Sequence, residues 1–292
     1  MTVIRPNVAE KRRNFRRLHD SGCFAIPNPW DIGTAIYLQE LGFKALATTS
    51  SGFAWSQGRA DSRVSLNQVL AHFEAMVAAT DVPVNADFES GYAKNVSELA
   101  RNVSLAVQTG IAGLSIEDST GDADRPLYDV DTAVDRVRTA RRAIDKAGGD
   151  TLLIGRAECF LVGRPDLPET IGRLQAYSAA GADCLYAPGL RTREDIVAVV
   201  VAIAPKPVNV LIGTASELIM QDVAALGVRR ISVGGALARS AWGSFMRAAK
   251  LIAQEGRFDG FKDAASGQEL NDLFKQVDRD AAPGGRQDEP HR

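Results

Sequence analysis

Short apolar runs alternate with amphipathic segments of roughly a dozen residues along most of the chain, which is the pattern of repeated strand and helix units. The runs show little polar alternation, as expected for parallel strands with helices on one face and a packed interior on the other. The pattern predicts eight strands, at Cys23–Pro27, Ala45–Thr49, Val84–Ala86, Gly113–Ile116, Leu152–Gly155, Cys184–Tyr186, Val208–Leu211 and Arg230–Val233.

Helical periodicity falls between these runs. Glycine often follows a helical segment, as in LGFKAL and AGADCL, where it supplies the left-handed C-cap that turns the chain into the next strand. Helices are predicted at Asp31–Leu41, Leu66–Ala79, Val96–Thr109, Thr132–Ala147, Glu169–Ala180, Arg193–Ile203 and Ser216–Leu226, with an eighth at Ala236–Glu255 and one further helix at Phe258–Val277.

Eight such units predict an α/β fold, a (β/α)8 TIM-type barrel, rather than an open doubly wound sheet. The segment NPWDIG follows the first strand, where a dinucleotide-binding sheet would carry GxGxxG. We expect the barrel to span residues 1–260, followed by a C-terminal helical extension over 261–279 and a disordered tail over 280–292.

Composition narrows the classes of function. A net charge of −2 gives no long-range reason to expect nucleic acid or an anionic membrane as a partner. The three cysteines are widely spaced and form no CxxC pair, which argues against a disulfide framework or a zinc knuckle. The N-terminus is too charged for a signal peptide, and no apolar run reaches the roughly 18 residues of a membrane span. We therefore expect a cytoplasmic protein.

Polar residues gather where the predicted strands end, which is where a barrel of this kind builds its active site. The opposite strand ends carry ordinary turn residues, and this asymmetry indicates an enzyme. The gathered residues are Asn28, Thr49, Ser50, Ser51, Gly52, Asp87, Glu89, Glu117, Asp118, Arg156 and Glu158, with Asn209 inside the seventh strand.

Carboxylates dominate this set. Asp87 and Glu89 stand two apart in NADFESGYA, so in an extended segment they point the same way, and Glu117 arrives from the neighbouring strand. Converging acids repel one another, which raises their pKa values unless a cation lies among them. Hard oxygen ligands suit Mg²⁺, or Mn²⁺. Solvated loop acids that pair with arginines are the alternative interpretation.

Arg156 ends the apolar strand LLIGRAE, where a charge is costly unless it is paired. A guanidinium suits bidentate binding of a substrate carboxylate, and an internal ion pair with Glu158 or Glu117 is the alternative. None of the three histidines falls at a strand end, and nothing obvious near Cys159 would lower the pKa of its thiol. Ser-His-Asp and Cys-His mechanisms are therefore not expected.

Ordered motifs run from Phe15 to Phe258, and together they resemble the isocitrate lyase/phosphoenolpyruvate mutase superfamily. The motifs are PNPWD, ALATTSSG, NADFESGY, GLSIEDS, GRAECF, GADCLYAPGL and VNVLIG. The resemblance implies a barrel whose C-terminal helix is exchanged between subunits, giving a homodimer or homotetramer. It also implies Mg²⁺ and an enolate or enolpyruvate-like intermediate formed from a small 2-oxo or 2-hydroxy acid.

The resemblance also implies roles for individual residues. Asp87 and Glu89 would bind the metal, and Glu117 would reach it through water. Asp61, in GRADS, would help to organise the metal site, and Arg156 would bind a substrate carboxylate or phosphonyl group.

Further substrate contacts are implied by the backbone cradle that Ser51, Gly52 and Phe53 would form around the substrate carboxylate and oxo group. Asn209, from the seventh strand, is also expected to bind substrate.

The sequence of the loop Ser119–Tyr128 matches neither of the two catalytic loop motifs that mark the superfamily's lyases and mutases. It lacks the KKCGH or KRCGH motif of isocitrate and methylisocitrate lyases and the KxN motif of the mutases, and Tyr186-Ala187-Pro188-Gly189 replaces the mutase His-Ser pair. We therefore expect a carbon–carbon lyase or decarboxylase acting on a small 2-oxo or 2-hydroxy dicarboxylate, with solvent protonating the enolate. The alternatives are a phosphonomutase-type P–C bond isomerase and a catalytically reduced ligand-binding barrel.

Overall fold

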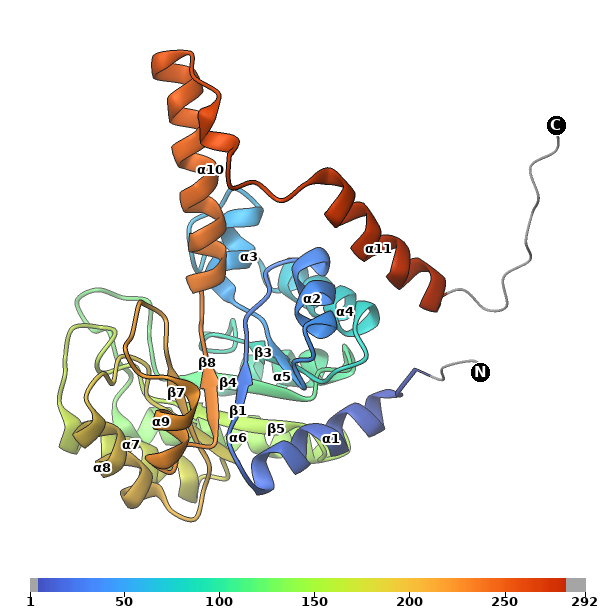
Figure 1. Ribbon diagram of the computed structural model, residues 1–292. Coiled ribbons are helices and arrows are strands. Elements are labelled where there is room, and N and C mark those ends of the chain that lie inside the picture. Colours follow the sequence, from blue (N-terminus) through green and yellow to red (C-terminus); the bar gives the residue numbers. More distant parts are fainter. Residues whose placement is uncertain (1–4, 282–292) are drawn as a thin grey trace. The chain divides into compact units, whose positions relative to one another are not determined.

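The structure is a computed structural model that describes residues 5–281. Eight parallel strands form one sheet in the order β1-β8-β7-β6-β5-β4-β3-β2. Figure 1 labels several of these strands among the helices that surround them. The Ala47 N–H donates to the Pro27 carbonyl (3.0 Å), so the two ends of the sheet meet and the barrel is nearly closed. The predicted α/β barrel is confirmed. The strands are β1 (Phe24–Ile26), β2 (Leu46–Ala47), β3 (Val84–Asp87), β4 (Gly113–Glu117), β5 (Leu152–Arg156), β6 (Cys184–Tyr186), β7 (Val208–Leu211) and β8 (Arg230–Ser232).

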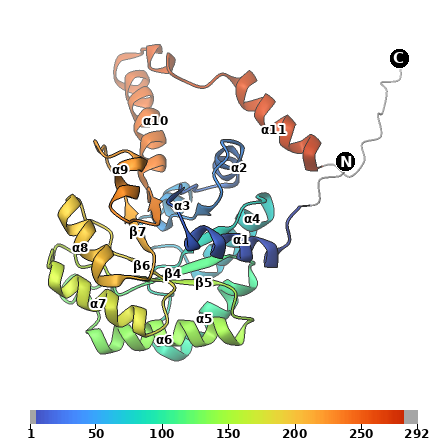
Figure 2. The same ribbon diagram turned by 60° about the horizontal axis from the view of Figure 1, so that its bottom comes forward.

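Helices follow the strands in sequence and pack around the outer face of the sheet, as α5 to α8 show in Figure 2. Several begin at a polar cap of the kind that the sequence offers: the side chains of Asp31, Ser65 and Thr192 each accept a hydrogen bond from the third residue beyond them. The helices of this unit are α1 (Val8–Asp20), α2 (Ile32–Glu40), α3 (Ser50–Ser56), α4 (Leu66–Ala79), α5 (Val96–Gln108), α6 (Val130–Lys146), α7 (Leu167–Ala179), α8 (Arg193–Ile203) and α9 (Met220–Ala225).

Two buried clusters divide the core. One lies between the sheet and the helices and contains Leu114, Ile116 and Ile231. The other lies inside the barrel, where Phe15 of α1 packs with Phe24, Ile154 and other strand residues. The periodicity did not predict α1, although its Asn7 side chain and Glu10 form a reciprocal capping box.

The compact unit that carries the barrel spans Asn7–Ala238, so it ends inside α10 (Ala236–Glu255). A second unit takes in the rest of α10, the short helix η1 (Asp259–Phe261) and α11 (Gly267–Ala281). The expected single helix Phe258–Val277 is therefore wrong. It is interrupted because the Ser266 side chain accepts from the Glu269 N–H (3.1 Å) and starts a new helix there.

Another helix is shorter than expected. The predicted segment Ser216–Leu226 becomes helical only at Met220, because Asp222 accepts from the Ile219 N–H (3.0 Å) and fixes the helix start. The predicted tail lies, from residue 282 on, outside the described residues. Among the helices that the structure describes, none combines the length and apolarity needed to cross a membrane.

Candidate active site

A cavity of about 200 Å³ opens at the carboxyl ends of the strands. Four of the residues to which the family resemblance gave roles line it directly: Ser51, Asp61, Asp87 and Arg156. Its wall is completed by residues from several strands and the segments that follow them, among them Asn28, Thr48, Asn85, Tyr186, Arg230 and Ser232.

Asp87, the last residue of β3, is held by the neighbouring strand. Its N–H donates to the Thr48 hydroxyl (2.9 Å), and its carboxylate accepts from the Ser50 N–H (3.0 Å). The Arg156 guanidinium lies 3.3 Å from the other carboxylate oxygen. These contacts fix Asp87 at the cavity wall, where a carboxylate oxygen can reach a bound ion or substrate.

Glu89 does not continue the strand. Its backbone lies in the left-handed region (φ 48°), and the strand ends at Asp87. The two side chains are therefore not aligned by an extended backbone, although the sequence predicts that alignment. The Tyr92 hydroxyl donates to the Glu89 carboxylate (2.6 Å). The pKa of Glu89 is raised, first by burial and then by the charge of Asp87, while the bond from Tyr92 opposes the shift.

Arg156, at the end of β5, lies among three acids. Its Nε binds Glu158, and its Nη1 lies 3.3 Å from both Glu117 and Asp87. Burial alone would lower the pKa of Arg156, but Glu158 and Glu117 raise it well above its usual value. The internal ion pair considered from the sequence is therefore present. Nη2 has no bond to another residue within the part of the chain that the structure describes, so the guanidinium keeps a donor for a ligand.

Glu117 is the most perturbed acid of the group. Its pKa is raised well above the usual value by burial, and Glu158, Asp87 and Glu89 add to the shift, whereas Arg156 opposes it. Asp61 is exposed at the rim, yet its pKa is also raised, first by partial loss of hydration and then by Asp87. The acids thus repel one another at this end of the barrel, as converging carboxylates do. Of these acids, Asp61 and Asp87 line the cavity, and Glu89, Glu117 and Glu158 do not.

Asp118 plays a different part from its neighbour Glu117. It points away from the barrel interior and accepts from the Glu158 N–H (2.8 Å), the Tyr177 hydroxyl (2.6 Å) and Arg173 Nη1 (3.1 Å). It therefore supports the backbone that carries Glu158 and does not face the cavity.

The expected backbone cradle coincides with α3, whose first turn holds Ser51 and Gly52. The Gly52 N–H donates to the Thr49 hydroxyl (3.3 Å), and the Phe53 N–H donates to the Thr49 carbonyl (3.0 Å). The Phe53 ring stacks on His72 (centroids 3.9 Å apart) outside the cavity. Only Ser51 of the three lines the cavity wall.

Asn209 lies fully buried beneath the cavity, bonded to Ser232 (3.0 Å) and Arg230 (2.8 Å). Sequence reasoning did not single out Arg230 or Ser232, and it noted Tyr186 only where the mutase His-Ser pair would stand; all three residues line the cavity. The signal was available, because an arginine and a serine two apart in the apolar run RRISV fall on one face of a strand.

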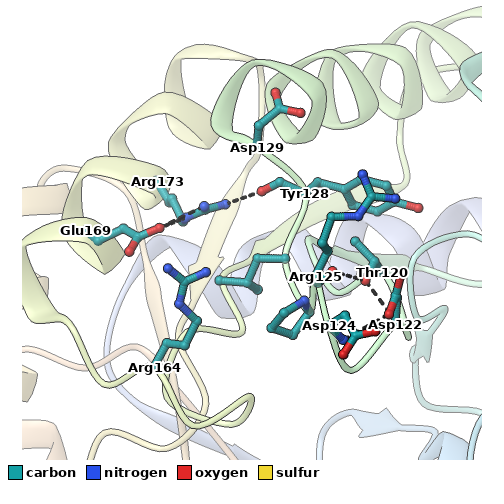
Figure 3. Close-up of a pocket in the computed structure, with 11 residues that line it drawn as sticks. Thr120, Asp122, Asp124, Arg125, Tyr128, Asp129, Arg164, Glu169 and Arg173 are labelled. Carbon is teal, nitrogen blue, oxygen red and sulfur yellow. Dashed lines mark hydrogen bonds and ion pairs between the residues drawn. The ribbon is translucent and has the colours of Figure 1, made fainter.

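A second cavity, of about 740 Å³, lies beside the loop that joins β4 to α6 (Figure 3). The loop base is ordered by a bridge between Ser119 and Leu127 and by Arg173, which donates to the Tyr128 carbonyl (3.0 Å). Arg125 and Arg164 line this cavity without an ion pair to another described residue. It holds none of the expected metal or substrate residues, so the smaller cavity is the candidate active site.

No three His, Cys, Asp or Glu side chains within residues 5–281 form a ready-made metal cage. The donor set nevertheless fits Mg²⁺, which takes one or two carboxylates and keeps several waters. Three acids, Asp87, Glu117 and Glu158, contact a single guanidinium, that of Arg156. Burial raises the pKa values of Glu117 and Glu158, and the neighbouring acids raise them further, so the site has more acids than its one cation balances. A divalent cation would offset that excess.

Comparison with known proteins identifies the family of the chain. The family model described as phosphoenolpyruvate phosphomutase matches residues 15–253. A solved structure from Burkholderia cenocepacia J2315, of a protein whose proposed class is lyase or mutase, is 44% identical with a TM-score of 0.89, covering 92% of this chain and 97% of that one.

Two curated relatives are named for their reactions. Oxaloacetate decarboxylase of Paraburkholderia xenovorans (strain LB400) is 28% identical over 235 residues, 77% of this chain and 76% of that protein. 2-Methylisocitrate lyase of Escherichia coli (strain K12) is 29% identical over 160 residues, 52% of this chain and 53% of that protein. The chain therefore belongs to the phosphoenolpyruvate phosphomutase family, within the isocitrate lyase/phosphoenolpyruvate mutase superfamily, and is an enzyme.

Proposed function

We propose that the protein is a Mg²⁺-dependent carbon–carbon lyase or decarboxylase that acts on a small 2-oxo or 2-hydroxy dicarboxylate through an enolate. The observation that carries the proposal is the grouping of Asp87, Glu117 and Arg156 at the ends of three adjacent strands. Asp87 and Arg156 line the cavity, and Glu117 lies behind its wall, 3.3 Å from Arg156. Similarity to a protein named oxaloacetate decarboxylase supports the same reaction type.

Asp87 and Glu89 would hold the metal, with Glu117 reaching it through water and Asp61 at the rim. A bound Mg²⁺ would act as a Lewis acid toward the oxygen on which negative charge develops. The alternative metal for the same oxygen donors is Mn²⁺.

Arg156 would bind the carboxylate next to the reacting carbonyl through its free Nη2, while its Nε and Nη1 stay on the internal acids. In a decarboxylation of oxaloacetate, the C3–C4 bond breaks, C4 leaves as CO₂, and the electron pair forms the enolate of pyruvate. Protonation at C3 then gives pyruvate. Cys159 is fully buried and burial raises its thiol pKa, so it is a poor proton donor, and solvent supplies the proton in our proposal.

The test is a screen of C3 to C6 2-oxo and 2-hydroxy dicarboxylates with Mg²⁺, in which pyruvate or glyoxylate release is followed by a coupled dehydrogenase. Each substrate is run again with EDTA and with EDTA plus excess Mg²⁺. Release that disappears with EDTA and returns with Mg²⁺ is the expected result.

Phosphorus NMR with phosphonopyruvate and Mg²⁺ separates the alternative. The appearance of phosphoenolpyruvate would replace the lyase by a phosphonomutase. Intact folding without turnover in either assay would favour a ligand-binding barrel. The cytoplasmic location and the homodimer or homotetramer stay predictions.

A further inference from the structure

The floor of the candidate active site contains a second arginine. Arg230 lines the cavity and is only 2% exposed. It belongs to β8, in register with Asn209 of β7, and its Nη1 lies 3.5 Å from Asn85 of β3. Because β8 and β3 are not neighbours in the sheet, the side chain must reach across the barrel interior, beneath the layer that holds Asp87 and Arg156.

No acid balances this charge in the part of the chain that the structure describes. The Nε of Arg230 donates to Asn209 (2.8 Å), the contact with Asn85 is long, and Nη2 has no bond to another described residue. Burial lowers the pKa of Arg230, while Cys184 and Tyr186 oppose the shift.

Arg173, another buried arginine of the unit, pairs with Asp118 and Glu169. Arg136 has no acid partner among the described residues either, but it donates to the carbonyl oxygens of Ser90 and Ala93 and lies over the Tyr128 ring, away from the cavity. A buried guanidinium without an anion is costly, and the cost is relieved when a ligand supplies the anion.

The hydrogen bonds above Arg230 direct donors toward the cavity. The Asn209 carbonyl oxygen accepts from Arg230, so its amide N–H₂ faces Ser232 and donates to that hydroxyl (3.0 Å). Ser232 and Tyr186 both line the cavity. The Ser232 oxygen accepts from Asn209 and its proton goes to the Tyr186 oxygen, which leaves the Tyr186 proton to donate to a bound oxygen.

We propose that Arg230, with the hydroxyls of Ser232 and Tyr186, forms a subsite for the second carboxylate of the substrate, opposite the carboxylate held at Arg156. This inference rests on the proposed function, since it assigns the distal end of the same dicarboxylate. It makes Arg230 a specificity-determining residue that selects dicarboxylates over monocarboxylates.

Equilibrium binding separates the subsite from turnover. L-Malate and L-lactate are both 2-hydroxy acids, and malate carries the additional carboxylate. Isothermal titration calorimetry with Mg²⁺ present should show that the wild-type protein binds malate at least about 10-fold more tightly than lactate. Arg230→Met should remove most of that difference by weakening malate binding, with little change for lactate.

Two further variants serve as controls. Arg230→Lys keeps the charge and should keep most of the preference for malate. Arg164→Met removes an exposed arginine at the larger cavity and should leave the preference unchanged. The thermal midpoint of Arg230→Met should stay close to the wild-type value, because removal of an unbalanced buried charge offsets loss of the hydrogen bond to Asn209.

Equal binding of malate and lactate by the wild-type protein, or binding of neither, would overturn the subsite. So would equal weakening of both ligands in Arg230→Met, or a large fall in its thermal midpoint, since each would make Arg230 a structural residue. A malate preference that depends on Arg230, in a protein that turns over no dicarboxylate, would keep the subsite and reject the lyase.

Discussion

Replacement of Asp118 by Asn should destabilise the barrel strongly, although the two side chains have nearly the same size. Asp118 is 2% exposed, and its two oxygens serve three donors. Oδ1 accepts from the Glu158 N–H, and Oδ2 accepts from both Tyr177 and Arg173. Either orientation of an Asn amide turns its N–H₂ group toward at least one of these donors.

The magnitude follows from the lost bond and the lost charge. A hydrogen bond to a charged group contributes about 1.5–3 kcal/mol, and a donor left unsatisfied in the interior costs about 1–3 kcal/mol more. Arg173 keeps its second acid, Glu169 at 2.8 Å, so its charge is not left wholly unpaired. We expect the free energy of unfolding to fall by about 3–4 kcal/mol, and the thermal midpoint by about 6–8 °C at roughly 2 °C per kcal/mol.

Urea unfolding followed by circular dichroism gives the free energy, and a thermal scan gives the midpoint. Asp122→Asn, in the exposed loop nearby, is the matched control and should change stability by less than about 0.5 kcal/mol. Because Asp118 holds the Glu158 backbone and Glu158 binds Arg156, kcat/KM should fall as well. A loss of stability below about 1 kcal/mol would show that the network does not support the site as described.

Three other changes test separate parts of the structure. Arg156→Lys cannot keep the contacts of Nε and Nη1 together, so KM for the dicarboxylate should rise about 10-fold or more, and an unchanged KM would leave Arg156 as an internal ion-pair residue only. His19 is neutral in the folded protein, because burial and then Arg230 lower its pKa from 6.5 to about 3. Below pH 6.5 the unfolded state binds a proton that the folded state does not bind, so the stability of the protein falls as the pH drops. The free energy of unfolding should fall by about 2 kcal/mol between pH 7.5 and pH 5. Urea unfolding should show a shallower pH dependence of that free energy in His19→Leu, and the same pH dependence as in the wild-type protein would contradict the assignment. Phe245, on α10, is 62% exposed. If α10 is exchanged between subunits, Phe245→Asp should shift the mass measured by light scattering toward that of the monomer. An unchanged mass would argue against the exchange.

The barrel could be predicted because its strands are apolar runs at regular spacing, and the strand positions match within one or two residues at most ends. Elements whose identity depends on tertiary contacts were harder to predict from the sequence. The first helix, α1, is strongly charged, and its burial rests on a few residues such as Phe15, which fills the barrel interior. The break between η1 and α11 depends on one capping serine, Ser266.

The site was predicted where strand ends alone decide it, as for Asp87 and Arg156. The different roles of Glu117 and Asp118 could not be predicted from two adjacent acids in the sequence, because they depend on which residues of β4 face inward. Ser115 lines the cavity while Leu114 and Ile116 pack against the helices, so Asp118 falls on the helix side. The same alternation turns Arg230 inward.

The central claim is that the acids at the strand ends hold a divalent metal that the reaction requires. Its most direct test is turnover of oxaloacetate as a function of Mg²⁺ concentration in the wild-type protein and in Asp87→Ala, with circular dichroism to confirm folding. The account predicts saturable Mg²⁺ activation in the wild-type protein and none in the variant at equal folding. Equal, Mg²⁺-independent pyruvate release by both proteins would contradict it.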